Sequence, residues 1–257
     1  MKNELKVFLT AVVFYTRIPC PSWVGHSDER LNKSTKYFPV IGWIVGGFSA
    51  LVFYVAQFLF PLHISLIFSM FVSILLTGAF HEDGFADVCD AFGGGWSKEK
   101  ILAIMKDSRI GTYGVIGIVL MLGLKYALLL EIAKLGIAMV AVVLIASHSI
   151  SRFTASTFIL THQYVRDDDT SKSKPIATKK LGLAERFFSA ITALLPLFLF
   201  KTWLAFFLIV PVYSGKVYLG HYFKKWIGGY TGDCLGATQQ VCEVVFYVSV
   251  LVLWKFI

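Results

Sequence analysis

Long apolar runs separated by short polar segments constrain this chain more than any other feature of its sequence. Hydropathy predicts seven such runs, at 40–60, 64–80, 114–133, 137–160, 187–200, 202–219 and 235–257. A helix needs about 20 apolar residues to cross the hydrocarbon core of a bilayer. Because backbone polar groups must be hydrogen-bonded internally within lipid, runs of this length favour helices. The sequence therefore predicts an all-α fold, a polytopic integral membrane helix bundle.

The expected number of transmembrane helices is about seven, within a range of six to eight. Only Lys201 separates the runs 187–200 and 202–219, so they are either two spans or one broken helix or shallow hairpin. Charged residues make up 16% of the 257 residues, against roughly 25% in soluble domains. Spans and short connections leave no room for a separate soluble domain. We expect residues 1–257 to form a single membrane-embedded catalytic domain.

Basic residues alternate between the two ends of the predicted spans. Successive segments outside the spans, counted from the N-terminus, carry six, none, four, one, six, one, two and one Lys or Arg. By the positive-inside rule, the segments rich in Lys and Arg face the cytoplasm. This topology accounts for the formal net charge of +8 without nucleic acid as a partner. The opposite side has only short turns, so we expect any functional site at the cytoplasmic face.

Three aspartates follow the second apolar run at a spacing that places them on one helical face. At about 100° per residue, Asp83, Asp87 and Asp90 fall within about 60° of arc. Carboxylates this close repel one another unless a cation neutralises them. Mg²⁺ prefers carboxylate and water oxygens and is commonly shared with substrate phosphates. We therefore predict that these aspartates are catalytic and bind Mg²⁺, with Glu82 ranked below them as a further ligand. The alternative is a solvated acidic face.

Basic residues close to the acidic stripe are candidates for substrate binding. Lys106 and Arg109 stand before the third run, and cations beside a metal stripe suit an oligophosphate. We therefore predict that residues 81–113 form an acidic and phosphate-clamping segment on the cytoplasmic side. Anchoring at the membrane interface explains Lys106 equally well and Arg109 less well.

Three further residues are predicted to contact substrate. Arg152 lies inside a span, where a charged side chain usually marks a functional site. Arg17 is flanked by apolar sequence, although snorkelling to lipid headgroups accounts for it nearly as well. Asp233 opens the last run, where an N-cap role and a substrate or metal role are compatible.

Together these motifs resemble the cobalamin synthase family, the membrane adenosylcobinamide-GDP ribazoletransferases of the vitamin B12 pathway. The resemblance covers nearly the whole chain, through segments 14–19, 38–42, 81–90, 105–112, 151–152 and 231–236. The family pattern His-x-Asp-Gly-x-x-Asp-x-x-Asp matches His81, Asp83, Gly84, Asp87 and Asp90. Residues 161–186 match least, and no role is transferred to them.

The resemblance implies an Mg²⁺-dependent transferase. It would join α-ribazole, or its 5′-phosphate, to adenosylcobinamide-GDP, releasing GMP and forming adenosylcobalamin or its 5′-phosphate. The ribazole 3′-hydroxyl would attack the phosphorus attached to the cobinamide arm, and Lys106 or Arg109 would stabilise the developing charge. The expected location is the bacterial cytoplasmic (inner) membrane, with the lipid bilayer as a partner and the active site facing the cytoplasm. Homo-oligomerisation is left open.

Two other functions fit parts of the sequence. A CDP-alcohol phosphotransferase also displaces a nucleoside monophosphate at an acidic membrane helix. Its Asp-Gly-x-x-Ala-Arg pattern fails here because Ala86 is followed by Asp87. A cation transporter would use the acids as an ion site, but such sites lie near the membrane midplane. The acidic stripe instead lies past the end of its apolar run, which disfavours transport.

Overall fold

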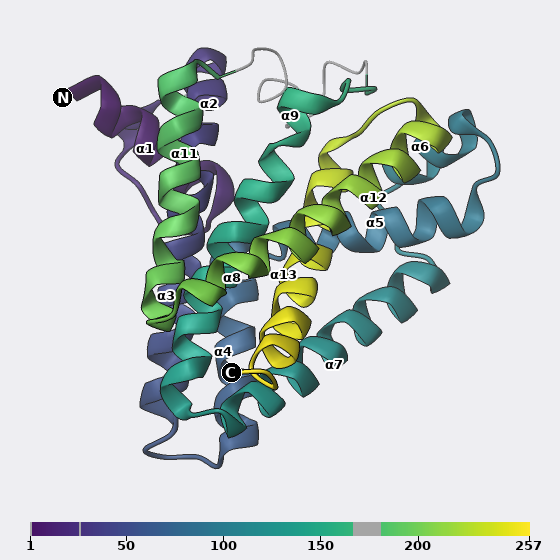
Figure 1. Ribbon diagram of the computed structural model, residues 1–257. Helices are drawn as coiled ribbons and strands as arrows, with labels where there is room; N and C mark the ends of the chain where they lie inside the picture. Colours follow the sequence, from purple (N-terminus) through teal and green to yellow (C-terminus); the bar gives the residue numbers. More distant parts are fainter. Residues whose placement is uncertain (1, 26, 167–180) are drawn as a thin grey trace.

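The computed structural model describes residues 2–25, 27–166 and 181–257, and these residues fold into helices joined by short connections (Figure 1). The α-helices are α1 (Lys2–Tyr15), α2 (Asp28–Ser34), α3 (Phe38–Ala56), α4 (Leu62–Thr77), α5 (Phe80–Gly94), α6 (Lys98–Lys106), α7 (Thr112–Lys134), α8 (Ile137–Ser156), α9 (Phe158–Thr161), α11 (Leu183–Leu194), α12 (Ile209–Ile227) and α13 (Gly232–Leu253). Four 3-10 helices complete the described chain: η1 (Ser22–Val24), η2 (Thr35–Tyr37), η3 (Leu195–Phe200) and η4 (Trp203–Leu208). The predicted all-α class is confirmed.

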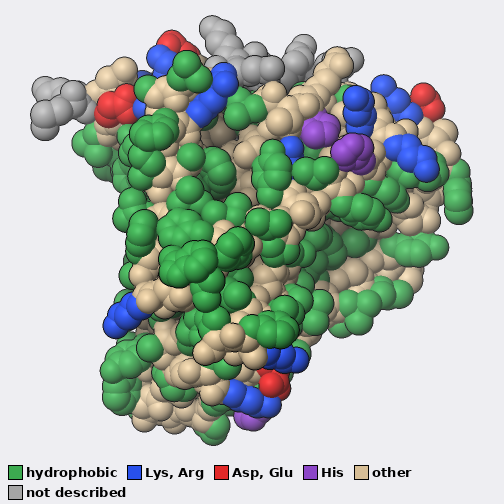
Figure 2. All heavy atoms as spheres, viewed as in Figure 1, with side chains coloured by type: hydrophobic (Ala, Val, Ile, Leu, Met, Phe, Trp, Pro, Cys, Tyr) green, Lys and Arg blue, Asp and Glu red, His purple; other side chains and the backbone are tan. Residues whose placement is uncertain are grey.

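In the part of the chain that the structure describes, six helical segments are long and apolar enough to cross a membrane. They are Asp28–Ala56, Thr112–Lys134, Ile137–Thr161, Leu183–Phe200, Trp203–Ile227 and Gly232–Leu253. The pair α4 and α5 adds a seventh if it is counted as one span bent by 88°. Apolar side chains cover the middle of the visible face, whereas most charged side chains gather toward its two ends (Figure 2). The predicted helical bundle of about seven spans is therefore confirmed.

A sharp corner separates α4 from α5. Gly78 and Ala79 adopt left-handed backbone conformations, with φ of 64° and 58°, and the helix axis turns there by 88°. A β-carbon on Gly78 would collide with the side chain of Arg17, so only glycine fits. Because of this turn, α5 does not continue the path of α4. We therefore treat α4 as the apolar arm of this bent pair and α5, with its four acidic residues, as an arm that lies outside the membrane-spanning segments.

The chain also breaks at Lys201, between two runs that the sequence left as two spans or one broken helix. Lys201 has a left-handed backbone, with φ of 56°, and ends η3. Thr202 then caps η4 by accepting a hydrogen bond from the backbone N–H of Leu204, at 3.3 Å. The segments on either side are each long enough to cross a membrane. The structure thus favours two spans.

Glycines bring helix backbones into close contact at several crossings of the described chain, of which two matter most here. On α3, a β-carbon at Gly46 would lie 2.6 Å from the carbonyl oxygen of Leu144 on α8. On α5, a β-carbon at Gly84 would lie 3.0 Å from the carbonyl oxygen of Asp233 on α13. Such small residues allow close helix packing in membranes. The second crossing places the acidic helix α5 directly against the start of α13.

Candidate active site

A cavity of about 370 Å³ lies where α5 meets the start of α13. Its polar lining comes from four separate parts of the chain and includes Arg17, His81, Asp83, Arg166 and Asp233. Aromatic rings form much of the remaining wall, namely Phe14, Tyr15, Phe38 and Phe80. Ligand pockets typically combine an apolar wall with a few convergent polar groups at about this size. We call this space the carboxylate cavity.

Two carboxylates from different helices line this cavity, and a third lies beside them. Asp83 and Asp233 line it, and half-buried Asp87 lies one turn after Asp83 on α5. Burial, followed by repulsion from Asp233, Asp83 and Asp90, raises the pKa of Asp87 to about 7. Groups held in such a repulsive arrangement are typical of functional sites. The predicted aspartates Asp83 and Asp87 thus meet a third, Asp233, which the sequence had proposed separately.

The side chain of Asp233 does not cap α13, because another residue has that role. The N-cap is Thr231, whose Oγ1 accepts a hydrogen bond from the backbone N–H of Cys234 at 3.3 Å. The N-cap role expected for Asp233 is therefore wrong. Its Oδ2 instead lies 3.4 Å from Nη1 of Arg166.

Arg166 is a site residue that sequence reasoning missed. It belongs to the segment that matches the family least, of which residues 167–180 lie outside the described part of the chain. Its guanidinium reaches the carboxylate cavity beside Asp233 and lowers the pKa of Asp87 against the dominant effect of burial. A single arginine in a polar loop carries no sequence signal for this placement.

Asp90 has a different environment from Asp83 and Asp87. Its Oδ2 accepts a hydrogen bond from the backbone N–H of Gly111 at 2.6 Å, and its Oδ1 accepts one from Gly114 at 2.8 Å. Both donors belong to the N-terminus of α7, where an acceptor stabilises otherwise unpaired N–H groups. The side chain is 9% exposed. Its contacts are those of a helix cap, which differs from the shared metal set predicted from spacing.

Glu82 faces away from the carboxylate cavity. Its Oε1 accepts a hydrogen bond from Nε2 of Gln240 at 3.0 Å, and it borders a small internal space with Lys125 and Glu243. This position is consistent with its 100° offset from the aspartate stripe, at about 100° per residue. Its contacts do not support the predicted role as a further metal ligand.

The predicted phosphate clamp lies elsewhere. Arg109 is paired with Asp107, with 2.6 Å between Nη2 and Oδ2, and its side chain is 87% exposed. Hydrogen bonds from Arg109 hold the pKa of Asp107 at about 2. Lys106 ends α6, and neither it nor Arg109 lines the carboxylate cavity. Of the basic residues predicted to contact substrate, only Arg17 lines this cavity in the described chain.

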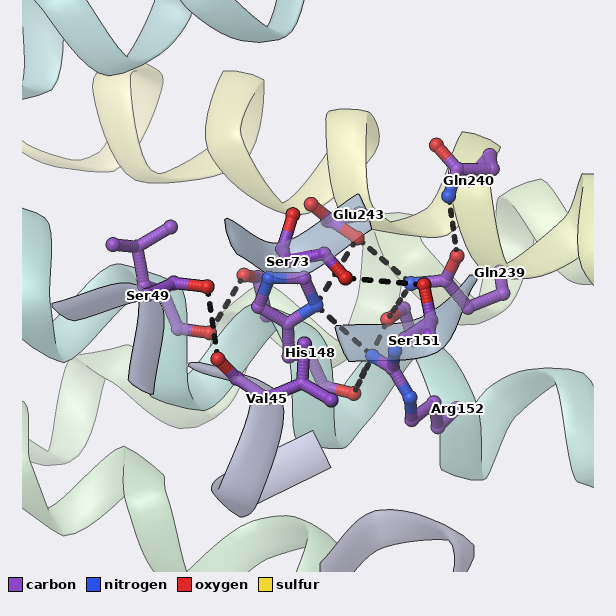
Figure 3. A network of polar contacts seen from close by, with 12 residues as sticks. Val45, Ser49, Ser73, His148, Ser151, Arg152, Gln239, Gln240 and Glu243 are labelled. Atoms are coloured by element: carbon purple, nitrogen blue, oxygen red, sulfur yellow. Dashed lines mark hydrogen bonds and ion pairs between the residues drawn. The ribbon is translucent and has the colours of Figure 1, made fainter. Parts of the chain in front are cut away.

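Arg152 belongs to a buried polar network between α8 and α13 (Figure 3). Its Nη1 lies 2.9 Å from Nδ1 of His148 and donates to the His148 carbonyl oxygen at 3.0 Å. The network continues to Glu243, whose Oε1 lies 3.0 Å from Nζ of Lys125. Gln239 donates to Glu243 Oε2 at 2.7 Å. Arg152 is 2% exposed and does not line the carboxylate cavity, so the structure does not support its predicted contact with substrate, which stays a prediction.

This network is connected by hydrogen bonds to α5, the helix that carries Asp83 and Asp87. Gln240 donates hydrogen bonds both to Gln239, at 2.9 Å, and to Glu82 on α5, at 3.0 Å. Charged groups inside a membrane are costly unless they are paired. Lys125 and Glu243 satisfy that requirement and tie α7 to α13. Each is an isolated charge in an apolar run, which is the sequence signal that could have identified them.

His81 lies between the network and the cavity. It is 2% exposed, lines the carboxylate cavity, and has no hydrogen-bond partner among the described residues at either ring nitrogen. Burial, assisted by the positive charge of Arg152, holds the pKa of His81 well below its usual range. The imidazole is therefore neutral and available to a ligand.

The donor set at this cavity suits a hard divalent cation. Among the described residues, no group of three or more His, Cys, Asp or Glu side chains is placed so that it could hold a metal ion. Asp83, Asp87 and Asp233 are nevertheless close enough to repel one another, and the positive charge of Arg166 acts on both Asp87 and Asp233. Oxygen donors of this kind are those that Mg²⁺ prefers. The residues present therefore fit such an ion chemically.

Comparison with known proteins finds relatives that match nearly the whole chain. A model of the cobalamin-5-phosphate synthase family matches residues 7–252. An adenosylcobinamide-GDP ribazoletransferase of Shewanella frigidimarina is 45% identical over 249 residues, covering 97% of this chain and 95% of the relative. The ribazoletransferase of Shewanella piezotolerans is 46% identical over 251 residues, covering 98% and 96%. No solved structure matches this chain. The predicted family is thus confirmed, and the chain belongs to the cobalamin-5-phosphate synthase family of cobalamin-synthesising membrane transferases.

Proposed function

We propose that this chain transfers the adenosylcobinamide-phosphate moiety of adenosylcobinamide-GDP to α-ribazole or its 5′-phosphate. The products are GMP and adenosylcobalamin or its 5′-phosphate. One observation carries the assignment to a site: carboxylates from α5 and α13 meet two arginines at one cavity, in a chain with ribazoletransferase relatives. Such a combination suits chemistry at a pyrophosphate, where both metal and guanidinium ligands are needed.

We further propose that Mg²⁺ binds to Asp83, Asp87 and Asp233. This set replaces the one expected from sequence, because Asp90 caps α7 and Glu82 contacts Gln240. When bound, the ion would polarise the pyrophosphate and neutralise the leaving phosphate. Repulsion among the three carboxylates supports the proposal, since a cation would relieve it.

The arginines are assigned to the substrate pyrophosphate. Arg166 approaches from the side of Asp233. Arg17 lines both the carboxylate cavity and a neighbouring cavity of about 490 Å³, so it lies between two spaces. Guanidinium groups bind phosphate oxygens through paired hydrogen bonds. We assign Arg17 and Arg166 the role first expected of Lys106 and Arg109.

The reaction is a substitution at phosphorus. The 3′-hydroxyl oxygen of ribazole forms a bond to the phosphorus that carries the cobinamide arm. The bond from this phosphorus to the bridging oxygen breaks, and GMP leaves with the bonding electron pair. A carboxylate of the cavity accepts the hydroxyl proton. The chain contributes binding, orientation and charge stabilisation, which dominate phosphoryl transfer.

We propose that the carboxylate cavity faces the cytoplasm in a bacterial inner membrane. In Figure 1, α1, α2, α6 and α9 lie toward one end of the molecule, opposite the α3–α4 and α7–α8 turns. Three of the four basic-rich segments predicted from sequence adjoin these elements, which supports the orientation. This side would also supply nucleotide substrates.

The test is release of GMP by the purified protein in lipid nanodiscs. With adenosylcobinamide-GDP, α-ribazole and Mg²⁺, we expect GMP and adenosylcobalamin in equal amounts. Omission of α-ribazole is the control for hydrolysis, and a CDP-alcohol donor tests the phosphotransferase alternative. Absence of GMP release with both acceptors, from protein that unfolds cooperatively, would contradict the proposal.

A further inference from the structure

A second cavity, of about 360 Å³, adjoins the carboxylate cavity. It lies between α8, α9 and α11, and its wall includes Phe153, Thr157, Leu160, Leu181, Phe187 and Ala190. Thr35, Ser156 and Ile159 line both cavities. The two spaces are therefore neighbours with a common boundary. We call the second one the apolar chamber.

Polar residues in the wall of the apolar chamber direct hydrogen bonds to the backbone. Ser156 Oγ donates to the carbonyl oxygen of Phe153 at 2.7 Å, and Thr157 Oγ1 donates to that of Thr154 at 2.6 Å. Nε of Arg186 donates to the Leu181 carbonyl oxygen at 2.7 Å. Asn32 and Ser189 also line the chamber, and aromatic and aliphatic side chains supply most of the remaining wall. The chamber thus suits a ligand with apolar, flat surfaces.

Thr35 is a polar exception at the shared boundary. It is 3% exposed, and its Oγ1 has no hydrogen-bond partner of standard geometry, although the Tyr15 hydroxyl lies nearby. Buried hydroxyls are usually hydrogen-bonded. A buried hydroxyl between an apolar space and a carboxylate site suits a ligand that is apolar at one end and polar at the other.

We propose that the apolar chamber binds the fused bicyclic aromatic base of the acceptor nucleoside, α-ribazole. Its ribose then extends past Thr35 toward Asp83 and Asp233. This inference rests on the proposed function and specifies where the acceptor lies. The hydroxyl that attacks phosphorus is on the ribose, so the base must occupy a space next to the carboxylates.

The other parts of the two substrates fit the chamber less well. Guanine needs several hydrogen-bond partners along its edge, and the hydroxyls of Ser156 and Thr157 are already engaged. A corrinoid macrocycle is too large for a space of about 360 Å³. A two-ring apolar base matches both the size and the lining of the chamber.

The test introduces a larger side chain into the apolar chamber from helix α11. Ala190 on α11 lines the apolar chamber, whereas Ala184 on the same helix is exposed and lines neither cavity. Binding of radiolabelled α-ribazole is measured by equilibrium dialysis, with and without adenosylcobinamide-GDP, for the wild type, Ala190→Phe and the matched control Ala184→Phe. We expect Ala190→Phe to weaken α-ribazole binding by at least about tenfold and Ala184→Phe to leave it unchanged. Ala190→Leu should lie between.

Steady-state kinetics provide the second readout. In Ala190→Phe, KM for α-ribazole should rise, while KM for adenosylcobinamide-GDP stays within about twofold of the wild type. An unchanged donor KM also shows that the variant is folded. Unchanged α-ribazole binding in both Ala190 variants, a rise in donor KM instead, or no α-ribazole binding by the wild type would overturn the inference. Wild-type binding without GMP release would contradict the proposed function alone.

Discussion

The close crossing of α5 and α13 can be tested by adding a single methyl group. In Gly84→Ala, the new β-carbon would lie 3.0 Å from the carbonyl oxygen of Asp233 and 3.1 Å from its Cα. An ordinary contact begins at about 3.4 Å, so α5 and α13 must separate by a few tenths of an ångström. Because Asp83 and Asp233 lie on either side of this contact, the carboxylates move apart with the helices.

The expected effects on stability and activity differ in size. Overpacking costs about 1–3 kcal/mol, and replacing a helical glycine by alanine returns up to about 1 kcal/mol. The free energy of unfolding should therefore fall by at most about 3 kcal/mol. Turnover should fall by about 10–100-fold, because small misplacements of catalytic groups weaken stabilisation of the transition state strongly.

The measurement compares GMP release and thermal unfolding of Gly84→Ala with those of Gly123→Ala. A β-carbon at Gly123, on α7, meets no atom within 4 Å, so this control changes only helix propensity. We expect Gly123→Ala to retain full turnover. Wild-type turnover in Gly84→Ala would show that the crossing does not set the geometry of the site, and would refute this reasoning.

Three further predictions concern individual side chains. Arg166→Ala should raise KM for adenosylcobinamide-GDP by about 10–100-fold, whereas Arg109→Ala, at an exposed residue, should leave this KM unchanged. A larger effect of Arg109→Ala in steady-state kinetics would instead support the phosphate-binding role predicted for Arg109 from sequence. Asp90→Asn should lower the free energy of unfolding by about 1–2 kcal/mol, measured by denaturant titration, because it weakens the cap of α7; unchanged stability would refute the capping role. Because the pKa of Asp87 is raised, the folded state binds the carboxyl proton of Asp87 more tightly than the unfolded state does. The resulting contribution to the free energy of unfolding is present below about pH 4 and is lost as the pH rises through 7. Without Mg²⁺, the melting temperature of the wild type should therefore fall relative to that of Asp87→Asn over this pH range. The fall should be equivalent to at most about 2 kcal/mol, because the side chain is half-exposed. A difference in melting temperature that stays constant with pH would contradict this prediction.

The helices were predictable from sequence because each span needs a long apolar run. The corner after α4 was not, since Gly78 and Ala79 carry no distinctive pattern, and the contact of Arg17 that leaves no room for a β-carbon at Gly78 depends on tertiary packing. Hydropathy therefore extended the second run to residue 80, whereas α4 ends at Thr77.

The candidate site was only partly predictable, for a related reason. Helical spacing correctly placed Asp83 and Asp87 on α5 near one another. Asp90 lies one turn further on and meets the start of α7, a contact that depends on how two helices pack. Arg109 is nearer to the aspartates in sequence than Arg166, yet α6 and the segment after it carry Arg109 away from the cavity. The positions of Asp90, Arg109 and Arg166 depend on tertiary packing, which the spacing of residues along the chain does not reveal.

In the proposed reaction, Asp83, Asp87 and Asp233 form one metal site at the pyrophosphate. The most direct test is the Mg²⁺ concentration that gives half-maximal GMP release in Asp233→Asn, compared with the wild type. Loss of one charged ligand should raise this concentration by at least about tenfold, with a lower maximal rate. An unchanged Mg²⁺ requirement and rate in Asp233→Asn would exclude Asp233 from the site and contradict the account.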